Sequence, residues 1–412
     1  MIPVYPKKRF YTFILIVLVN LILTISLIFG MEFVSSRFIS KPGGNLVSHS
    51  RLNHTWRPNS VQIHNEWIAS NPDFPHPYTH YYNRQGWLEK YDIQKKKPRS
   101  TYRVFYLGDS FIEGTCPMDQ SLPSIVERRL NDMAKDNKLM FEVINTGTSS
   151  YSPTIFYLLV RYVLMGYTPD LVVINIDMTD DFDDWKYSQT LIRDNDGNPE
   201  FSLSRNIYTD LFIDTENKVL RATLWKKIQL FLIHNSYTYN LILYIKKKFI
   251  STNASGKKLL PNEMAQKIYQ RWSWCRSNWD DLTAKNVKNT FDLLRRLSTF
   301  CRQNNIKIMF TSVPHYWQYA GNENGTGKPL WSNRPHYDIS NLSKELDVPY
   351  LNSFEKLKPL IGGTPQTKFY YNRNMHFNPR GYAVWAEAHI EFLTTKEYAL
   401  LPEPFYSIDT NK

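Results

Sequence analysis

The sequence has little cysteine. Its 412 residues include only three, Cys116, Cys275 and Cys301. No two of them form a Cys-x-x-Cys pair, and an odd number cannot be paired completely within one chain. The sequence therefore predicts neither a disulfide framework nor a zinc site, while one bridge between two of the three stays open. We expect no metal and no cofactor.

The sequence also lacks concentrated positive charge, although its formal net charge is +12. Lysine and arginine are scattered or lie in short runs such as Lys95 to Lys97 and Lys246 to Lys248. No basic helix, RNA-binding aromatic strand or zinc-finger spacing accompanies them, so we expect no nucleic-acid partner. Attraction to an anionic membrane surface or an acidic polymer explains the charge as well.

Aromatic residues are plentiful, at 15% of the chain with 27 Tyr and 11 Trp. Such a content suits a surface that stacks on sugar rings or packs on lipid, and an aromatic core explains it equally.

One long hydrophobic run stands near the amino terminus, from Phe10 to Met31. At 1.5 Å per residue it is long enough to cross a hydrocarbon core of about 30 Å. It is longer than a signal-peptide apolar region and lacks a good cleavage site, so we expect an uncleaved, single-pass anchor over residues 10–31. Lys7, Lys8 and Arg9 precede it. The positive-inside rule then predicts a cytoplasmic tail over residues 1–9 and places the rest of the chain outside the cytoplasm.

The segment after the anchor, residues 32–100, has no clear period and is interpreted as a stalk followed by a strap over the main domain. From residue 101 to about 395, short apolar runs alternate with helical patterns. This alternation predicts an α/β fold, a three-layer α/β/α flavodoxin-like arrangement with a sheet of about five parallel strands. The five runs are Val104–Leu107, Phe141–Ile144, Leu171–Ile176, Ile306–Thr311 and Pro349–Leu351.

An insertion of about residues 186–286 separates the third and fourth predicted strands and is too long for an ordinary connection. We expect it to be largely helical and to cap the site. Its apolar stretch from Leu230 to Ile250 contains polar interruptions, which favour a buried or interfacial helix over a second membrane span. Residues 396–412 are expected to form a carboxyl-terminal tail.

A serine and a histidine occupy positions that suit nucleophilic catalysis. Ser110 follows Gly108 and Asp109 at the turn between a strand and a helix, where free amide groups can stabilise an oxyanion. His376 stands just before the last helix, where it can reach back to Ser110 as a general base. Either residue alone has an ordinary structural explanation, as a helix cap or as part of the core.

With these residues in place, four ordered segments over about residues 80 to 395 resemble the SGNH (GDSL-like) hydrolase family. The resemblance implies that Ser110 is the nucleophile and His376 the base, with Asn374 at the position of the triad acid. It also implies an oxyanion hole formed by Ser110, Gly147 and Asp180. The four segments are Gly108-Asp109-Ser110-Phe111, Asn145-Thr146-Gly147, Asp180-Asp181 and Asn374-Met375-His376.

The chain departs from the family pattern at two of these positions. The family has asparagine where this chain has Asp180, and an ionised carboxylate there would repel an oxyanion unless it is protonated or turned away. The family has aspartate where this chain has Asn374, which can orient an imidazole but cannot offset its positive charge.

The acidic run around the third segment, Asp177 to Asp184, lacks the glycine and the final glutamate of a calcium-binding loop. We expect it to be a solvated loop. Three further residues are candidates for substrate contact, namely His315, Asp181 and Tyr151, and a structural role explains His315 equally well.

These observations favour a serine esterase or O-acyl (acetyl) transferase that acts on an extracytoplasmic carbohydrate through an acyl-enzyme on Ser110. A lipid esterase or lysophospholipase is an alternative, supported by the anchor and by the stretch from Leu230 to Ile250. A degenerate glycan-binding or assembly protein is another, supported by Asp180 and Asn374. The acyl acceptor and the oligomeric state are left open.

Overall fold

The structure is a computed structural model of the chain. The described residues are 7–38, 46–64, 77–136, 138–202, 212–214, 219–221, 225, 228, 231–232, 235–254, 270–320, 332–372 and 374–405. The ends of the two predicted tails and parts of the predicted insertion therefore lie outside them. The chain divides into two compact units, one of Met1–Val47 with Arg205–Leu260 and one of Ser48–Ser204 with Pro261–Lys412.

The second unit is built on a five-stranded sheet in which every pair of neighbours is parallel. The strand order is β13-β12-β7-β5-β6. Each strand agrees with one of the five predicted apolar runs to within a few residues, and the three-layer α/β prediction is confirmed. The strands are β5 (Thr101–Leu107), β6 (Met140–Asn145), β7 (Leu171–Ile176), β12 (Lys307–Ser312) and β13 (Tyr350–Asn352).

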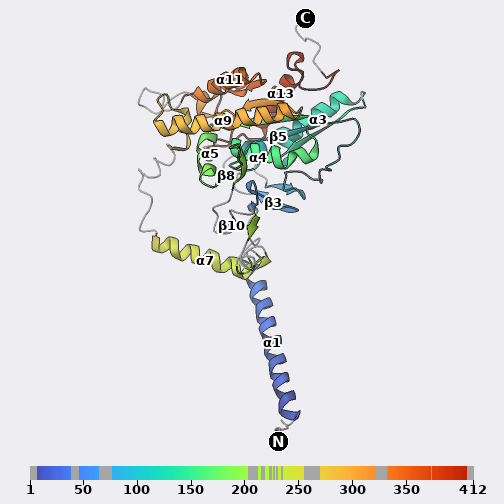
Figure 1. Cartoon of the computed structure of the whole chain (residues 1–412), viewed down its shortest axis with the longest axis vertical. Helices are drawn as coiled ribbons and strands as arrows, with labels where there is room; N and C mark the ends of the chain where they lie inside the picture. The colour runs from blue at the N-terminus through green and yellow to red at the C-terminus, as the bar shows by residue number, and fades with distance from the viewer. Residues whose placement is uncertain are drawn as a thin grey trace. The chain divides into compact units, whose positions relative to one another are not determined.

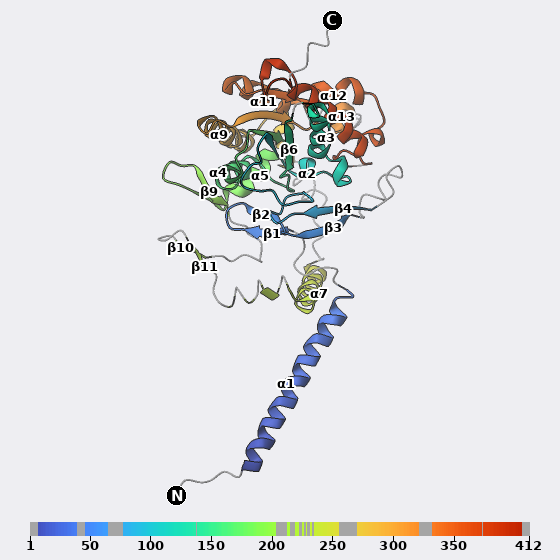
Figure 2. The same cartoon turned by 90° about the vertical axis from the view of Figure 1, so that its right-hand side faces the viewer.

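Helices cover both faces of this sheet (Figures 1 and 2). Alternate residues of β5 belong to different apolar cores: Val104 and Tyr106 to one, Phe105 and Leu107 to the other. Strands buried on both faces are continuous apolar runs, and this explains why the sequence marks them clearly. The covering helices are α3 (Leu122–Ala134), α12 (Ser353–Ile361) and α13 (Pro379–Leu393) on the first face, and α4 (Pro153–Tyr162), α9 (Asp281–Gln303) and α11 (Arg334–Leu346) on the second.

The strand order reverses beside β5. The chain passes from β5 to β6 on one side and then to β7 on the other side of β5. In sheets of this kind, the crevice beyond the carboxyl ends of the strands at such a reversal is where ligands bind. The segments after β5, β6 and β7 all meet there.

The predicted strap contains four short strands that the sequence did not reveal. They are rich in His, Asn and Tyr rather than in aliphatic residues, so no apolar period marks them. β3 and β4 form an antiparallel pair in which Ser60 is opposite Tyr82. The four strands are β1 (Leu46–His49), β2 (Asn53–Trp56), β3 (Ser60–His64) and β4 (Tyr78–Tyr82).

The region between β7 and α9 is not purely helical, so the expected helical insertion is wrong in part. Its described elements include four short strands, and its segment Arg205–Leu260 groups with the amino-terminal helix rather than with the sheet. The expectation that the insertion caps the site stays a prediction. The elements are α5 (Asp180–Ser188), β8 (Leu191–Arg193), β9 (Pro199–Ser202), β10 (Phe212–Asp214), β11 (Val219–Arg221) and α7 (Tyr237–Ala254). Two four-residue helices complete the second unit, α2 (Ser110–Glu113) and α10 (Trp317–Ala320).

In the first unit, α1 (Lys7–Ser35) carries the predicted anchor. The segment Tyr11–Ser35 is long and apolar enough to cross a membrane, and its most apolar stretch is not buried within the protein. The Glu32 carboxylate near the end of α1 accepts hydrogen bonds from the Ser236 hydroxyl and from the amides of Tyr237 and Thr238. These are the first groups of α7, so α7 starts beside the end of the apolar helix.

Candidate active site

Ser110 lies at a tight turn between β5 and α2. A Cβ on Gly108 would lie 2.3 Å from Cγ1 of Ile112, so the turn requires glycine there. The Asp109 carboxylate caps α2 by accepting a hydrogen bond of 2.9 Å from the Phe111 amide. Glycine and aspartate thus fix the local turn that presents the serine hydroxyl.

Ser110 and His376 are in direct contact, with 2.7 Å between Oγ and Nε2. The opposite ring nitrogen, Nδ1, lies 2.7 Å from Oδ1 of Asn374. Because an amide oxygen only accepts, Nδ1 carries the ring hydrogen and Nε2 is free to accept the serine proton. The Asn374 oxygen also accepts a hydrogen bond from the His376 backbone amide, at 3.0 Å. Asn374 therefore sets both the orientation and the tautomer of the ring.

His376 is only 8% exposed. Burial, aided by the positive charges of His315 and Arg271, lowers its pKa to about 3. The imidazole is therefore neutral at pH 7, which is the form that a general base needs.

A cavity of about 330 Å³ opens beside the serine and the histidine. Its wall combines α2, the strap and residues from the loops after β6 and before α9. The lining residues are Trp56, Gln62, His64, Tyr78, Asp109, Ser110, Glu113, Gly114, Thr115, Ser149, Ser150, Arg271, Met375 and His376.

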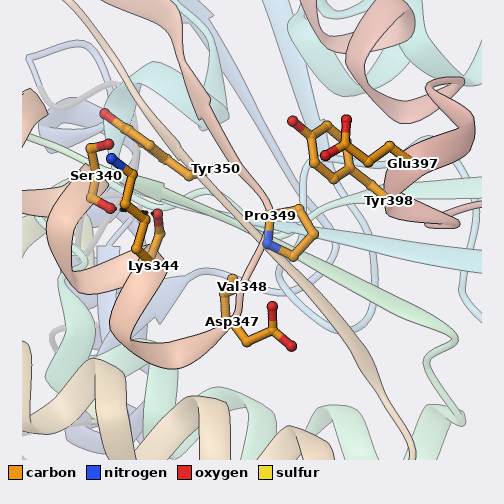
Figure 3. Close-up of a pocket in the computed structure, with 9 residues that line it drawn as sticks. Ser340, Lys344, Asp347, Val348, Pro349, Tyr350, Glu397 and Tyr398 are labelled. Carbon is orange, nitrogen blue, oxygen red and sulfur yellow. Dashed lines mark hydrogen bonds between the residues drawn. The ribbon is translucent and has the colours of Figure 1, made fainter.

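A second, larger cavity of about 640 Å³ lies at the amino-terminal end of β13 and includes Lys344, Tyr350 and Tyr398 (Figure 3). It lies at the sheet edge opposite the carboxyl ends of the strands. None of its lining residues forms a nucleophile–base pair within the described part of the chain, so the smaller cavity is the candidate site.

Gly147 packs directly against the backbone of α2. A Cβ there would lie 2.2 Å from the Glu113 nitrogen, so this close approach admits only glycine. The Gly147 amide, which the resemblance assigns to the oxyanion hole, donates to Oδ1 of Asn145 at 3.0 Å. It would have to exchange this bond to bind an oxyanion.

The acidic run is not a solvated loop, and that expectation is wrong. All five of its aspartates are at most 4% exposed, and most of the run begins α5. Asp184 explains why: its two oxygens accept hydrogen bonds from Ser152 and Thr154 at the start of α4 and from Thr290 of α9. The run is therefore a buried junction between helices. Among the described residues, no group of His, Cys, Asp and Glu is arranged to hold a metal ion.

Asp180 is turned back onto its own turn, where its Oδ2 accepts a hydrogen bond of 3.1 Å from the Asp177 amide. Burial, together with repulsion from neighbouring aspartates, raises its pKa well above the ordinary range. A protonated Asp180 would not repel an oxyanion. Neither Asp180 nor Gly147 is among the described residues that line the cavity.

The three candidates for substrate contact do not line the cavity either. His315 is fully buried, with Nε2 2.7 Å from Oδ1 of Asp177. The Asp181 carboxylate accepts a hydrogen bond from Ser273, and burial raises its pKa to about 8. The Tyr151 hydroxyl donates to the His54 carbonyl at 2.6 Å.

Sequence reasoning missed several residues that do line the cavity, above all Glu113 and Arg271. Glu113 stands one helical turn after Ser110, a spacing that places both on one face of a helix and could have marked it. It accepts hydrogen bonds from Tyr82 and Ser149, and burial raises its pKa to about 7. Arg271 belongs to a stretch without a motif, so no sequence signal identifies it.

The three cysteines are buried and unpaired, so no bridge forms among them.

We predict that Gly147→Ala disrupts the site. The added methyl group must displace the backbone of α2, which carries Ser110, and such overpacking costs about 1–3 kcal/mol of stability. Thermal unfolding should show a lower Tm, and the rate at which a fluorophosphonate labels Ser110 should fall. Gly166→Ala is the control, because a Cβ there meets no atom within 4 Å. An unchanged labelling rate in Gly147→Ala would contradict the role given to this close approach.

Comparisons with known proteins add little beyond the fold. No family model and no curated protein matches the sequence. Solved structures with a similar arrangement include an acetylxylan esterase from Geobacillus stearothermophilus, at 10% identity and a TM-score of 0.40 over 73% of this chain and 97% of that chain. An alpha/beta hydrolase enzyme from the metagenome of Lake Arreo, Spain, matches at 11% identity and a TM-score of 0.36 over 72% and 96%. At these values the likenesses carry no argument about chemistry. What the structure itself shows is a parallel five-stranded α/β fold that brings Ser110 and His376 into contact.

Proposed function

We propose that this protein is a serine esterase or acyl transferase of the SGNH type, which forms an acyl-enzyme on Ser110 and acts on an O-acyl ester of an extracytoplasmic carbohydrate. The observation that carries the proposal is the contact of 2.7 Å between Ser110 and a neutral His376 at the wall of a cavity.

In the first half-reaction, Nε2 of His376 takes the proton from Ser110 as Oγ attacks the ester carbonyl. The tetrahedral intermediate collapses when His376 returns the proton to the leaving sugar hydroxyl. A water molecule or a second sugar hydroxyl then attacks the acyl-enzyme by the reverse of these steps. Asn374 keeps the ring oriented throughout.

The composition of the cavity supports a carbohydrate over a lipid. Gln62, Ser149, Glu113 and Arg271 supply hydrogen-bonding groups suited to a ligand rich in hydroxyl groups. Trp56 supplies an aromatic surface of the kind that sugars contact. A long acyl chain would place apolar surface against these polar groups, at a cost in desolvation.

We predict that a fluorophosphonate probe labels the wild-type protein and that Ser110→Ala abolishes both labelling and ester hydrolysis. Only a serine activated by a base reacts rapidly with such a probe. The matched control is Ser124→Ala on α3, outside the cavity. Wild type that is folded by circular dichroism and resists labelling would instead support the alternative of a degenerate glycan-binding protein.

Asn374→Asp should increase the rate of labelling and of hydrolysis at pH 7. A carboxylate beside Nδ1 stabilises the imidazolium, an effect of up to about 10⁴-fold in the well-studied triad. The same charge raises the pKa of His376 from about 3, so the acid limb of the pH–rate profile should move to higher pH. The profile of each variant, measured from pH 4 to pH 8, checks both effects. If neither the rate nor the limb changes, Asn374 does not occupy the position of the triad acid.

We further propose that α1 spans the membrane with the amino terminus in the cytoplasm and the catalytic unit outside. Protease added to the outer face of the membrane should then digest the chain after residue 40. Complete protection in intact spheroplasts, with digestion only after lysis, would reverse the orientation.

A further inference from the structure

One charged side chain in the cavity wall has a buried nitrogen that the described residues do not satisfy. Arg271 lines the same cavity as Ser110 and His376. Its Nε is enclosed by protein and has no hydrogen-bond partner among the described residues. Asp177 and Asp183, on which its charge acts, are paired with His315 and Lys186. A buried guanidinium nitrogen without an acceptor is costly, and a ligand that supplies one would be favoured.

The positive charge of Arg271 favours the ionised forms of Asp109, Asp177 and Asp183, but the bonding partners of these acids lie elsewhere. The Asp109 oxygen is occupied by the Phe111 amide, and burial with repulsion from Asp177 raises the pKa of Asp109 well above its ordinary range. The Glu113 oxygens accept from Tyr82 and Ser149. Asp177 is paired with His315. Arg271 is therefore a positive charge presented to the cavity.

A second polar atom in the cavity wall is also unsatisfied. Oε1 of Gln62, on β3 of the strap, is enclosed and has no described hydrogen-bond partner. It is an acceptor, whereas the guanidinium group is a donor. A ligand that satisfies both carries a hydrogen-bond acceptor, for which the positive charge favours an anionic group, and a hydrogen-bond donor such as a hydroxyl group.

Resting on the proposed function, we propose that Arg271 binds the carboxylate of an acidic sugar, and that Gln62 accepts a hydrogen bond from one of its hydroxyl groups. The substrate class is then an O-acylated uronic acid rather than a neutral sugar. Arg271 is a specificity-determining residue, and the planar guanidinium group suits a carboxylate because it can form two parallel hydrogen bonds.

The test compares two substrates that differ in one group: O-acetylated oligogalacturonide, and the same oligosaccharide with its carboxylates reduced to primary alcohols. The full-length protein in detergent should show a higher kcat/KM for the acid. Arg271→Gln should lower kcat/KM on the acid by about 10- to 100-fold, the loss expected for a charged hydrogen bond. The decrease in kcat/KM on the reduced substrate should be much smaller, so Arg271→Gln should lose the preference for the acidic substrate. Arg271→Lys should keep part of that preference.

Arg129→Gln is the matched control, because Arg129 is exposed on α3 and pairs with Glu387 outside the cavity. It should keep the wild-type preference.

Three results would overturn the proposal. The wild type could show no preference for the acid. Arg271→Gln could lower kcat/KM equally on the acidic and the reduced substrate, which would assign the arginine to the oxyanion instead. The wild type could hydrolyse lysophosphatidylglycerol with a higher kcat/KM than the oligogalacturonide, and Arg271→Gln could lack that preference. This result would assign the arginine to a lipid phosphate.

A binding measurement distinguishes a failure of the esterase proposal from a failure of the acidic-sugar proposal. Calorimetry with Ser110→Ala should detect the oligogalacturonide, and adding Arg271→Gln should weaken that binding by a similar factor. If the wild type neither labels nor hydrolyses but this difference in binding persists, the esterase proposal fails and the acidic-sugar site stands. If Arg271→Gln leaves the binding unchanged, the acidic-sugar site fails.

Discussion

A parallel sheet must be covered on both faces, and the whole site depends on that constraint. Strand β5 lies between β6 and β7, and its residues alternate between two buried cores. Because all three strands run the same way, the segments that follow them end at one edge of the sheet. The turn with Ser110, the loop with Gly147 and the start of α5 are therefore neighbours before any side chain is considered. The loop with Gly147 packs so closely on α2 that a Cβ at this position would lie 2.2 Å from the Glu113 nitrogen.

The sequence predicts this framework well because burial on both faces leaves a strong signal. Val104 to Leu107 and Leu171 to Ile174 are unbroken apolar runs, as expected for strands with no solvent-facing side. The strap gives no such signal, since β3 places buried Ser60 and His64 beside exposed Val61 and Ile63. Polar residues that are buried against a cavity invert the usual pattern, so periodicity alone cannot find them.

The same reasoning explains which parts of the site were predictable. Ser110 and His376 stand in motifs whose spacing and strand context are specific. The prediction of a solvated loop for the acidic run was wrong because a cluster of aspartates normally lies in water. Here Asp184 joins three helices through hydrogen bonds, and its burial raises its pKa to about 6. No local pattern predicts hydrogen bonds to Ser152 and Thr290, which lie 32 and 106 residues away along the chain.

The electrostatics of His376 link the catalytic pair to the arginine in the cavity. Asn374 gives the ring no negative charge, and the charges of Asp177 and His315 act on it with opposite sign. Burial then dominates, and the positive charge of Arg271 lowers the pKa of His376 further. A carboxylate bound to Arg271 would offset that charge, and the pKa of His376 would rise. The base would therefore become stronger when an acidic substrate is in place. In such a site the substrate contributes part of the negative charge that an aspartate contributes in a complete triad, and asparagine at position 374 is compatible with catalysis.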